Sequence, residues 1–321
     1  MTEPFVRPDV RAHLDQQAAG PRLVFSDELM AMIRQLPPQM MTDMLAQLDA
    51  PAPPMGEVRD LAMPGPGGEI ALRMFDPRAE RGPGPVVVFC HGGGFVVGSI
   101  DTHAPMVAAL ASGLDLPVIS VEYRLAPENP WPAAPDDAEA AARWIAGNAA
   151  AFGREFTHLV LCGDSAGGTL SLVTALALRD RPAALPVLAQ IPIYPRTDST
   201  RPYPSGQEFA EGFGLDGANI AYYTQAYRAD RSHWRGSPLL ADLTGVAPML
   251  MVTAGLDPLR DEGRAYAAKA IEAGVNVAYR EFAGTVHGFC TYRRAIPSAQ
   301  EDFASLIVLA REVLAAALRA G

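Results

Sequence analysis

The sequence feature that most constrains the fold is a glycine-rich turn between two contrasting patterns. An apolar run that ends at Cys162 leads into Gly163-Asp164-Ser165-Ala166-Gly167-Gly168, and an apolar pattern with helical spacing follows from Thr169. This order is typical of a buried strand, a sharp turn and a helix. The glycines remove side chains that would clash in such a turn, so the serine can occupy a strained position with its hydroxyl exposed.

Similar alternation continues along most of the chain and predicts the fold class. Short apolar runs rich in β-branched residues alternate with helical patterns, as in a parallel sheet whose strands are buried on both faces. We therefore expect an α/β fold with a mostly parallel central sheet and helices on both faces. The predicted strands are Ile70 to Phe75, Val86 to Cys90, Val118 to Tyr123, Leu159 to Cys162, Leu188 to Ile193, Met249 to Thr253 and Val277 to Phe282, and the predicted helices cover about 104–113, 136–150, 167–179, 259–273 and 299–319.

Two segments stand outside this alternation. Residues 8 to about 48 carry the spacing of two or three short helices, interrupted by Pro37 and Pro38. Residues 196 to about 235 form an unusually long stretch between two strand signals, and its part from Ile220 to Tyr227 is rich in aromatic residues. An insertion of that length in an α/β core is usually a lid or cap.

The charge balance and the apolar segments limit the partners that we expect. The chain has a net charge of −10, which repels nucleic-acid phosphates and anionic lipid headgroups, so we expect no nucleic-acid partner. The longest apolar stretch near the end of the chain, Ala304 to Ala310, is far shorter than the roughly 20 residues that span a bilayer. The amino-terminal residues do not have the pattern of a secretory signal. These observations predict a cytoplasmic protein without stable membrane insertion.

A second glycine-rich turn suits the stabilisation of a negative charge. The apolar run from Pro85 to Cys90 ends in His91-Gly92-Gly93-Gly94-Phe95. Consecutive glycines let backbone N–H groups converge on one point, as an oxyanion hole requires. We expect Gly92, Gly93 and Gly94 to form this hole together with the N–H of Ala166, the residue after the serine.

An acid and a histidine follow the serine in the chain order that enzymes with such a turn use. Asp257 and Asp261 lie just after the strand signal that starts at Met249, and Asp257 falls in the loop itself. Asp261 falls in the first turn of the next helix, where an acid complements the helix dipole. His287 follows the last strand signal. We therefore predict that Ser165 is the nucleophile, that His287 is its base and that Asp257 orients the imidazole.

These motifs together resemble one enzyme family. HGGGF, YRLAPE, GDSAGG, DPLRDEG and VHGF, in this order over about residues 85 to 295, are similar to the hormone-sensitive lipase-like (bacterial family IV) carboxylesterases of the α/β-hydrolase superfamily. The resemblance implies an α/β-hydrolase fold with a helical cap: residues 1–50 and 196–228 form the cap, and residues 51–195 and 229–321 form the core. It also implies hydrolysis of short- to medium-chain acyl esters without a cofactor or metal, and a possible homodimer through the last strand and its neighbouring helix.

Other activities remain open from the sequence. The same triad serves formamidases, lactonases and peptidases, and pocket shape decides between them. A non-catalytic binding protein is a further alternative, although related plant hormone receptors lack the histidine that His287 provides here. A long-chain lipase is less favoured because no clear interfacial helix is present. Six aromatic residues are expected either to line or roof the substrate pocket or to pack in the core, namely Phe95, Tyr194, Phe209, Phe213, Tyr222 and Tyr223.

Overall fold

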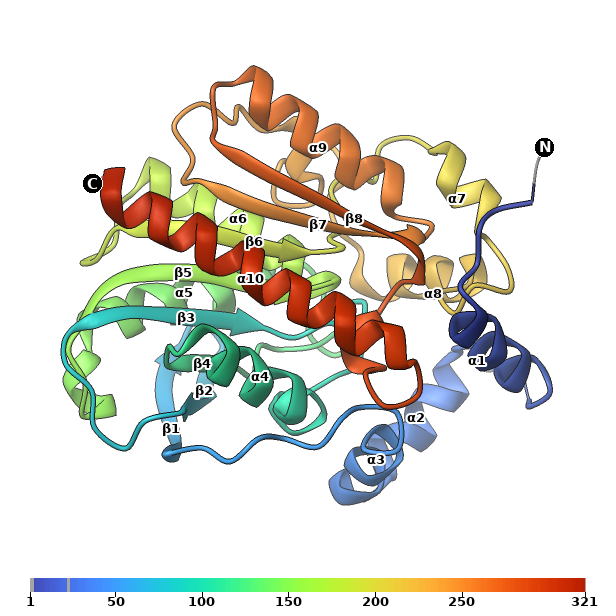
Figure 1. Cartoon of the computed structure of the whole chain (residues 1–321), viewed down its shortest axis with the longest axis horizontal. Coiled ribbons are helices and arrows are strands. Elements are labelled where there is room, and N and C mark those ends of the chain that lie inside the picture. Colours follow the sequence, from blue (N-terminus) through green and yellow to red (C-terminus); the bar gives the residue numbers. More distant parts are fainter. Residues whose placement is uncertain (1–2, 22–23, 321) are drawn as a thin grey trace.

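An eight-stranded sheet forms the centre of the protein (Figure 1). The computed structural model describes residues 3–21 and 24–320. The strand order is β1-β2-β4-β3-β5-β6-β7-β8; β1, β2 and β4 pair antiparallel, and every pairing from β4 to β8 is parallel. The strands are β1 (Glu57–Gly65), β2 (Gly68–Asp76), β3 (Gly84–Cys90), β4 (Val118–Val121), β5 (Phe156–Asp164), β6 (Val187–Ile193), β7 (Met249–Leu256) and β8 (Val277–Val286).

Helices cover both faces of this sheet because alternate residues of its strands are apolar. In β3, Val87 and Phe89 join one core cluster with helices α4 and α10, whereas Val86 and Val88 join a second cluster with α5 and α6. Met251 of β7 packs in a third cluster with α6 and α9. Strands buried on both faces explain the near-continuous apolar runs of the sequence. The covering helices are α4 (Ile100–Leu114), α5 (Ala133–Gly147), α6 (Ala166–Asp180), α9 (Arg260–Glu272) and α10 (Pro297–Ala320).

The predicted α/β-hydrolase fold is confirmed, and one strand was missed. All seven predicted strands are present as β2 to β8, and the five predicted helices correspond to the five that cover the sheet. Strand β1 forms a hairpin with β2 at the edge of the sheet, with Gly65 opposite Gly68. Its outer residues are exposed and it contains Pro64, which is tolerated at a sheet edge but weakens a strand signal in a sequence.

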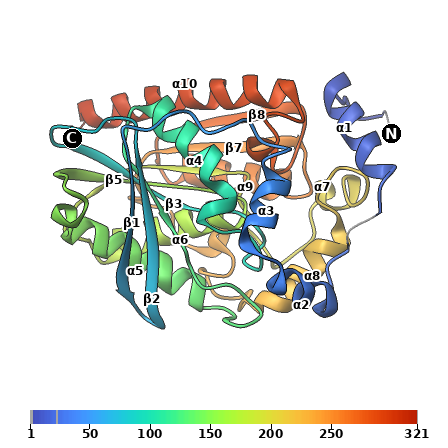
Figure 2. The ribbon, with the colours of Figure 1, turned by 90° about the horizontal axis from the view of Figure 1, so that it is seen from below.

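The two segments outside the alternation lie together at one end of the molecule (Figures 1 and 2). Helices α1 (Pro8–Ala18), α2 (Asp27–Gln35) and α3 (Pro38–Leu45) precede the sheet, and α7 (Pro204–Glu208) and α8 (Gly217–Tyr227) follow β6. The N–H of Phe25 donates to Asn219 Oδ1 at 2.9 Å, and the Tyr222 hydroxyl donates to Asp27 Oδ1 at 3.1 Å. Segments about 195 residues apart in the chain therefore pack against each other beside the carboxyl ends of the parallel strands.

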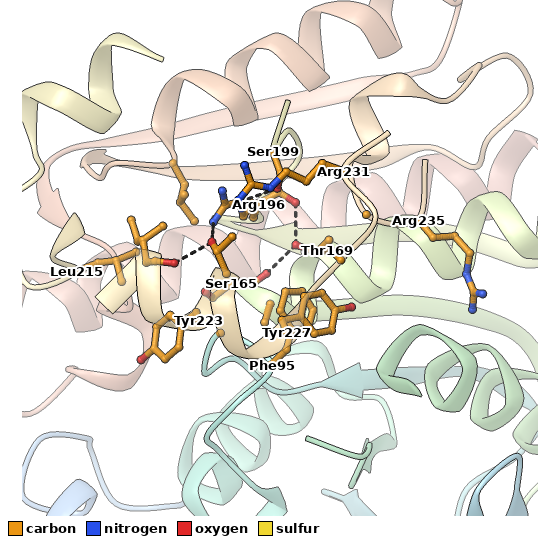
Figure 3. Close-up of a pocket in the computed structure, with 17 residues that line it drawn as sticks. Phe95, Ser165, Thr169, Arg196, Ser199, Leu215, Tyr223, Tyr227, Arg231 and Arg235 are labelled. Carbon is orange, nitrogen blue, oxygen red and sulfur yellow. Dashed lines mark hydrogen bonds between the residues drawn. The ribbon is translucent and has the colours of Figure 1, made fainter. Parts of the chain in front are cut away.

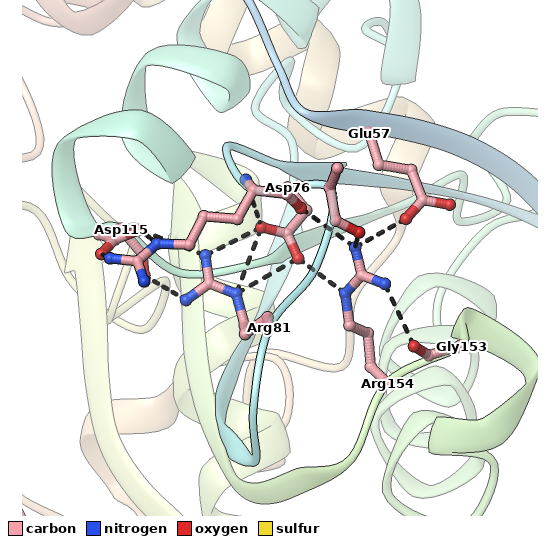
Figure 4. Close-up of polar contacts among 8 residues, drawn as sticks. Glu57, Asp76, Arg81, Asp115, Gly153 and Arg154 are labelled. Carbon is pink, nitrogen blue, oxygen red and sulfur yellow. Dashed lines mark hydrogen bonds and ion pairs between the residues drawn. The ribbon is translucent and has the colours of Figure 1, made fainter.

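The opposite end of the sheet is held by a buried group of ion pairs (Figure 4). Asp76 ends β2, next to the start of β4, and its side chain is fully buried. It accepts hydrogen bonds from Arg81 Nη2 at 2.9 Å and from Arg154 Nε at 2.8 Å. Arg154 also pairs with Glu57 of β1 at 2.7 Å. These contacts connect the antiparallel edge of the sheet to the segment that enters β5.

Within the described residues, no helix is both long and apolar enough to cross a membrane.

Candidate active site

Ser165 lies at a sharp turn directly after β5, as the glycine pattern predicts. Its φ and ψ angles are 52° and −117°, a conformation that non-glycine residues seldom adopt. A side chain on Gly163 or Gly167 would overlap backbone atoms, because a Cβ on Gly167 would lie 1.8 Å from the carbonyl oxygen of Cys90. The N–H of Ser165 donates to Ile193 O of β6 at 2.8 Å, which fixes the turn against the neighbouring strand.

The structure brings Ser165, His287 and Asp257 into one hydrogen-bonded series. His287 Nε2 lies 2.8 Å from Ser165 Oγ, and His287 Nδ1 lies 2.7 Å from Asp257 Oδ2. The three residues follow β5, β8 and β7, so parallel strands deliver them to the same edge of the sheet. Asp257 is fully buried, and its other oxygen accepts the N–H of Leu259 at 2.8 Å. This arrangement can remove a proton from the serine hydroxyl and stabilise the resulting imidazolium.

Asp261 has a different environment from Asp257. It lies in the first turn of α9, as predicted, and its carboxylate accepts the N–H of Ser205 at 2.9 Å and pairs with Arg260 at 2.8 Å. These contacts attach α9 to α7. Its pKa is lowered: burial opposes ionisation, but the Arg260 pair and the Ser205 N–H outweigh it. Asp261 therefore connects elements of the fold and makes no contact with His287.

The glycine turn after β3 lies beside Ser165, but its three N–H groups are not equivalent. The N–H of Gly92 donates to Asp164 Oδ1 at 2.8 Å, so it already has a partner. Gly93 and Gly94 have φ angles of 119° and 62°, in the region that favours glycine. Gly94, Ser165 and Ala166 line the same pocket. The oxyanion donors that we expect are therefore reduced to Gly93, Gly94 and Ala166, with Gly92 as a structural contact.

A buried polar group supports the two glycine turns. Asp164 Oδ1, which accepts the Gly92 N–H, also lies 3.5 Å from His103 Nε2. Burial alone would raise the pKa of Asp164, but the neighbouring His103 lowers it below its usual value, and the pKa of His103 is raised in turn. Burial, together with His103, lowers the pKa of His91 to about 3. Asp164, the residue that precedes Ser165, thus connects the glycine turn after β3 to the nucleophile turn through its hydrogen bond with the Gly92 N–H.

A pocket opens at Ser165 between the sheet and α8 (Figure 3). Of the aromatic residues that we expected there, Phe95 and Tyr223 line it. Phe95 stacks on Tyr227, which the sequence did not indicate, with ring centroids 3.8 Å apart. The pocket lining consists of Gly94, Phe95, Ser165, Ala166, Thr169, Arg196, Ser199, Leu215, Ile220, Tyr223, Thr224, Tyr227, Ala229, Arg231, Arg235, Gly236 and Leu259.

The other expected pocket residues lie elsewhere. Tyr194 is buried with its ring 4.7 Å from that of His287, outside the lining of the pocket. Phe209 packs against Phe213, and Tyr222 points toward Asp27. Their positions depend on how α7 and α8 pack, which the sequence pattern does not specify.

Three pocket arginines were not predicted from the sequence. Arg196 could have been recognised as a pocket residue, because it follows β6 at the same sheet edge as Ser165, whereas Arg231 and Arg235 carry no such signal.

Comparison with known proteins supports an ester-hydrolase relationship. A family model described as alpha/beta hydrolase fold matches residues 87–291. Esterase LipI from Mycobacterium tuberculosis (strain ATCC 25618 / H37Rv) is 38% identical over 271 residues, 82% of this chain and 84% of that protein. Ethyl acetate hydrolase from Pseudomonas putida is 38% identical over 248 residues, 75% of this chain and 78% of that protein. The solved structure of a hyperthermophilic esterase from the archaeon Pyrobaculum calidifontis is similar, with a TM-score of 0.86 and 34% identity, covering 96% of this chain and 98% of that one.

Proposed function

Since the chain belongs to the α/β-hydrolase fold family, in its hormone-sensitive lipase-like branch, and is an ester hydrolase, we propose that Ser165, His287 and Asp257 catalyse the reaction. The observation that carries the proposal is the pair of contacts at His287, 2.8 Å to Ser165 Oγ and 2.7 Å to Asp257 Oδ2. A serine joined to a base that is itself oriented by a buried carboxylate is the arrangement of an activated nucleophile.

The reaction follows from these contacts in two halves. Ser165 Oγ attacks the ester carbonyl carbon while His287 Nε2 takes the hydroxyl proton, and the negative oxygen develops beside the N–H groups of Gly93, Gly94 and Ala166. When the intermediate collapses, the bond to the alcohol oxygen breaks and His287 returns the proton to that oxygen. A water molecule then attacks the acyl-serine with His287 as base, which releases the acid and restores the Ser165 hydroxyl. The net reaction consumes one ester and one water and yields one acid and one alcohol.

We further propose short- to medium-chain esters as substrates and a cap formed by residues 1–50 and 196–228. Leu215, Ile220 and Tyr223 line the pocket at Ser165 and belong to the second of these segments, which supports its assignment to the cap. A cytoplasmic location and a homodimer through β8 and α10 also remain predictions. β8 is the last strand of the sheet, and although Gly284 O near its end accepts the Arg7 N–H at 3.3 Å, the edge before Gly284 can pair with a second copy of the chain. Sedimentation at several protein concentrations would test this.

The experiment that tests the proposed function is hydrolysis of p-nitrophenyl esters from acetate to palmitate. We expect turnover that is greatest at short or medium chains and is abolished in Ser165→Ala. Ser305→Ala, which changes an exposed serine on α10, is the matched control and should retain wild-type rates. Full activity of the Ser165→Ala variant would disprove the triad. Absence of activity on every ester by the folded wild type would instead favour an amide or lactone substrate, or binding without catalysis.

A further inference from the structure

The pocket at Ser165 contains a concentration of positive charge that ester hydrolysis itself does not use. Three arginines, Arg196, Arg231 and Arg235, line it together with the apolar side chains of Phe95 and Tyr227. Figure 3 shows Arg196 and Arg231 on the same side of the pocket, opposite Phe95 and Tyr227. No acidic residue lines this pocket among the residues that the structure describes.

The three guanidinium groups differ in how their charge is balanced. Arg235 pairs with Asp136 at 2.7 Å, so its charge is compensated within the fold. Arg196 donates from Nε to Ser199 Oγ at 3.0 Å and from Nη1 to Thr224 Oγ1 at 3.2 Å, which are neutral partners. For Arg231 no side-chain hydrogen bond or ion pair is found within residues 3–21 and 24–320.

Glu262 is close enough to Arg196 for their charges to interact, but it does not balance the Arg196 charge near pH 7. Glu262 is buried, and burial raises its pKa to about 8 despite the opposing effects of Arg196 and of the Thr197 N–H. It is therefore mostly protonated near pH 7. Within the described part of the chain, half-buried Arg196 and exposed Arg231 therefore line one pocket without an anionic partner that balances their charge. A substrate group can supply that partner.

The location of the pocket indicates which part of an ester would meet the arginines. His287 returns its proton to the departing alcohol, so the alcohol must lie on the His287 side of Ser165. The pocket is lined by Gly94 and Ala166 on the oxyanion side, and its lining includes neither His287 nor Asp257. It therefore receives the acyl part of the substrate.

We propose that this pocket binds esters whose acyl chain ends in a carboxylate, with Arg196 and Arg231 contacting that group. The inference rests on the proposed function, which it narrows to monoesters of short dicarboxylic acids. The planar guanidinium fork matches a carboxylate, and the apolar wall of Phe95 and Tyr227 suits the methylene chain between the two ends. Hydrolysis then yields a dicarboxylate and an alcohol.

The test compares two esters with the same alcohol and the same acyl length, mono-p-nitrophenyl adipate and p-nitrophenyl hexanoate. We expect the wild type to have a higher kcat/KM for the adipate ester. The ratio of the two kcat/KM values should fall on the order of tenfold in Arg231→Gln and further in Arg231→Glu, because charge-assisted hydrogen bonds are lost and then replaced by repulsion. Arg196→Lys should retain more of the ratio than Arg196→Gln, since it keeps the charge.

A matched control separates pocket binding from the overall electrostatic field. Arg228 is exposed and lies outside the lining of this pocket, so Arg228→Gln removes the same charge without removing a contact. It should leave the ratio unchanged. Since Arg231 is also exposed, its variants should fold even if those at Arg196 do not.

The outcomes distinguish this inference from the function on which it rests. Turnover of the hexanoate ester with a poorer adipate ester, or a ratio that Arg231→Gln and Arg231→Glu do not change, would overturn the carboxylate site and leave the esterase in place. An equal fall of the ratio in Arg228→Gln would also overturn it. No hydrolysis of either ester by the folded wild type would overturn the proposed function and this inference together.

Discussion

Ser165 is held in a backbone conformation that costs free energy, and its neighbours make that conformation possible. Glycines at 163 and 167 allow α6 to approach β3 so closely that a Cβ on Gly167 would overlap Cys90 O. Strained residues persist only where the surrounding structure determines them, and they are concentrated at functional sites. The same turn places the hydroxyl 2.8 Å from His287 Nε2.

The two acids after β7 provide a direct test of the roles assigned to them. We expect Asp257→Asn to lower kcat about 10⁴-fold, because an amide would hold the imidazole in the wrong tautomer. Asp261→Asn should have a much smaller effect on kcat, since Asp261 contacts Ser205 and Arg260 instead of His287. Steady-state kinetics of both folded variants would measure this. Equal losses would contradict the assignment of the acid.

Glu262 should make stability depend on pH in an unusual direction. Burial raises its pKa from 4.5 to about 8. Between these values the unfolded chain loses the proton while the folded chain keeps it, so the unfolded state binds fewer protons and stability falls as the pH rises. The Gln in Glu262→Gln cannot ionise and can still accept the Thr197 N–H through its amide oxygen. We therefore expect the Tm of this variant, relative to wild type, to rise steadily between pH 5 and pH 8.

An exposed glutamate in the same helix gives the comparison for that measurement. Glu272 lies at the end of α9 with its side chain in solvent, so Glu272→Gln should show a constant Tm difference from wild type over the same range. A constant difference for Glu262→Gln as well would show that Glu262 titrates normally in the folded protein.

Most of the proposed catalytic residues could be predicted because each directly follows a strand. The parallel register brings Ser165, Asp257 and His287 to one edge, so local patterns and chain order suffice. The substrate pocket could not be predicted in the same way. Tyr194 and Tyr222 lie near or within the predicted cap insertion, yet the ring of Tyr194 is 4.7 Å from that of His287 and Tyr222 faces Asp27, because contacts between distant segments decide where they point.

At the scale of elements, α8 is in direct contact with the oxyanion turn. A Cβ on Gly94 would lie 2.4 Å from Cγ of Tyr223, so the helix packs on the turn without space for a side chain. α8 belongs to the segment that we expect to be the cap. A shift of this helix would therefore change the geometry of the predicted oxyanion hole. The sequence predicted a glycine turn after the strand that ends at Cys90 and an aromatic-rich insertion that contains α8, but not the contact between them.

We expect Gly94→Ala to lower kcat by at least tenfold, because the methyl group displaces either the turn or Tyr223 and the φ of 62° disfavours alanine. Gly94→Ala combined with Tyr223→Ala should recover part of the loss, since it removes the overlap but not the backbone penalty. Gly274→Ala is the control: Gly274 has a φ of 80° with open space around it, so it should cost some stability and leave kcat unchanged. Wild-type kcat in Gly94→Ala would contradict this contact.

At the scale of the whole molecule, the site and the ion-pair group around Asp76 occupy opposite ends of the sheet. The parallel strands end at Ser165, Asp257 and His287, and Asp76 lies where they begin. Its pKa is lowered: burial opposes ionisation, but Arg81, the Arg78 N–H and Arg154 outweigh it. This charge therefore stabilises the fold at pH values above the usual range of an aspartate, and the contribution is lost as the pH falls through its lowered pKa.

Removal of the Asp76 charge should destabilise the fold without altering ester hydrolysis at Ser165. We expect Asp76→Asn to reduce the free energy of unfolding by about 3 kcal/mol, because Arg81 and Arg154 lose the buried carboxylate that they share. Urea unfolding would measure the change. Asp60→Asn, which breaks the exposed pair with Arg73, should cost less than about 1 kcal/mol. Equal effects of the two substitutions would show that burial adds nothing to the Asp76 group.

The central claim is that Ser165 is the nucleophile, and the most direct measurement is covalent labelling with diethyl p-nitrophenyl phosphate followed by peptide mass spectrometry. Attack by Ser165 Oγ on phosphorus would expel p-nitrophenolate and leave a diethylphosphoryl group on the serine. We predict one such group per chain, on the peptide that contains Ser165, with activity lost in the same proportion and no label in Ser165→Ala. A label on another residue, or full labelling of Ser165 with activity retained, would contradict the account.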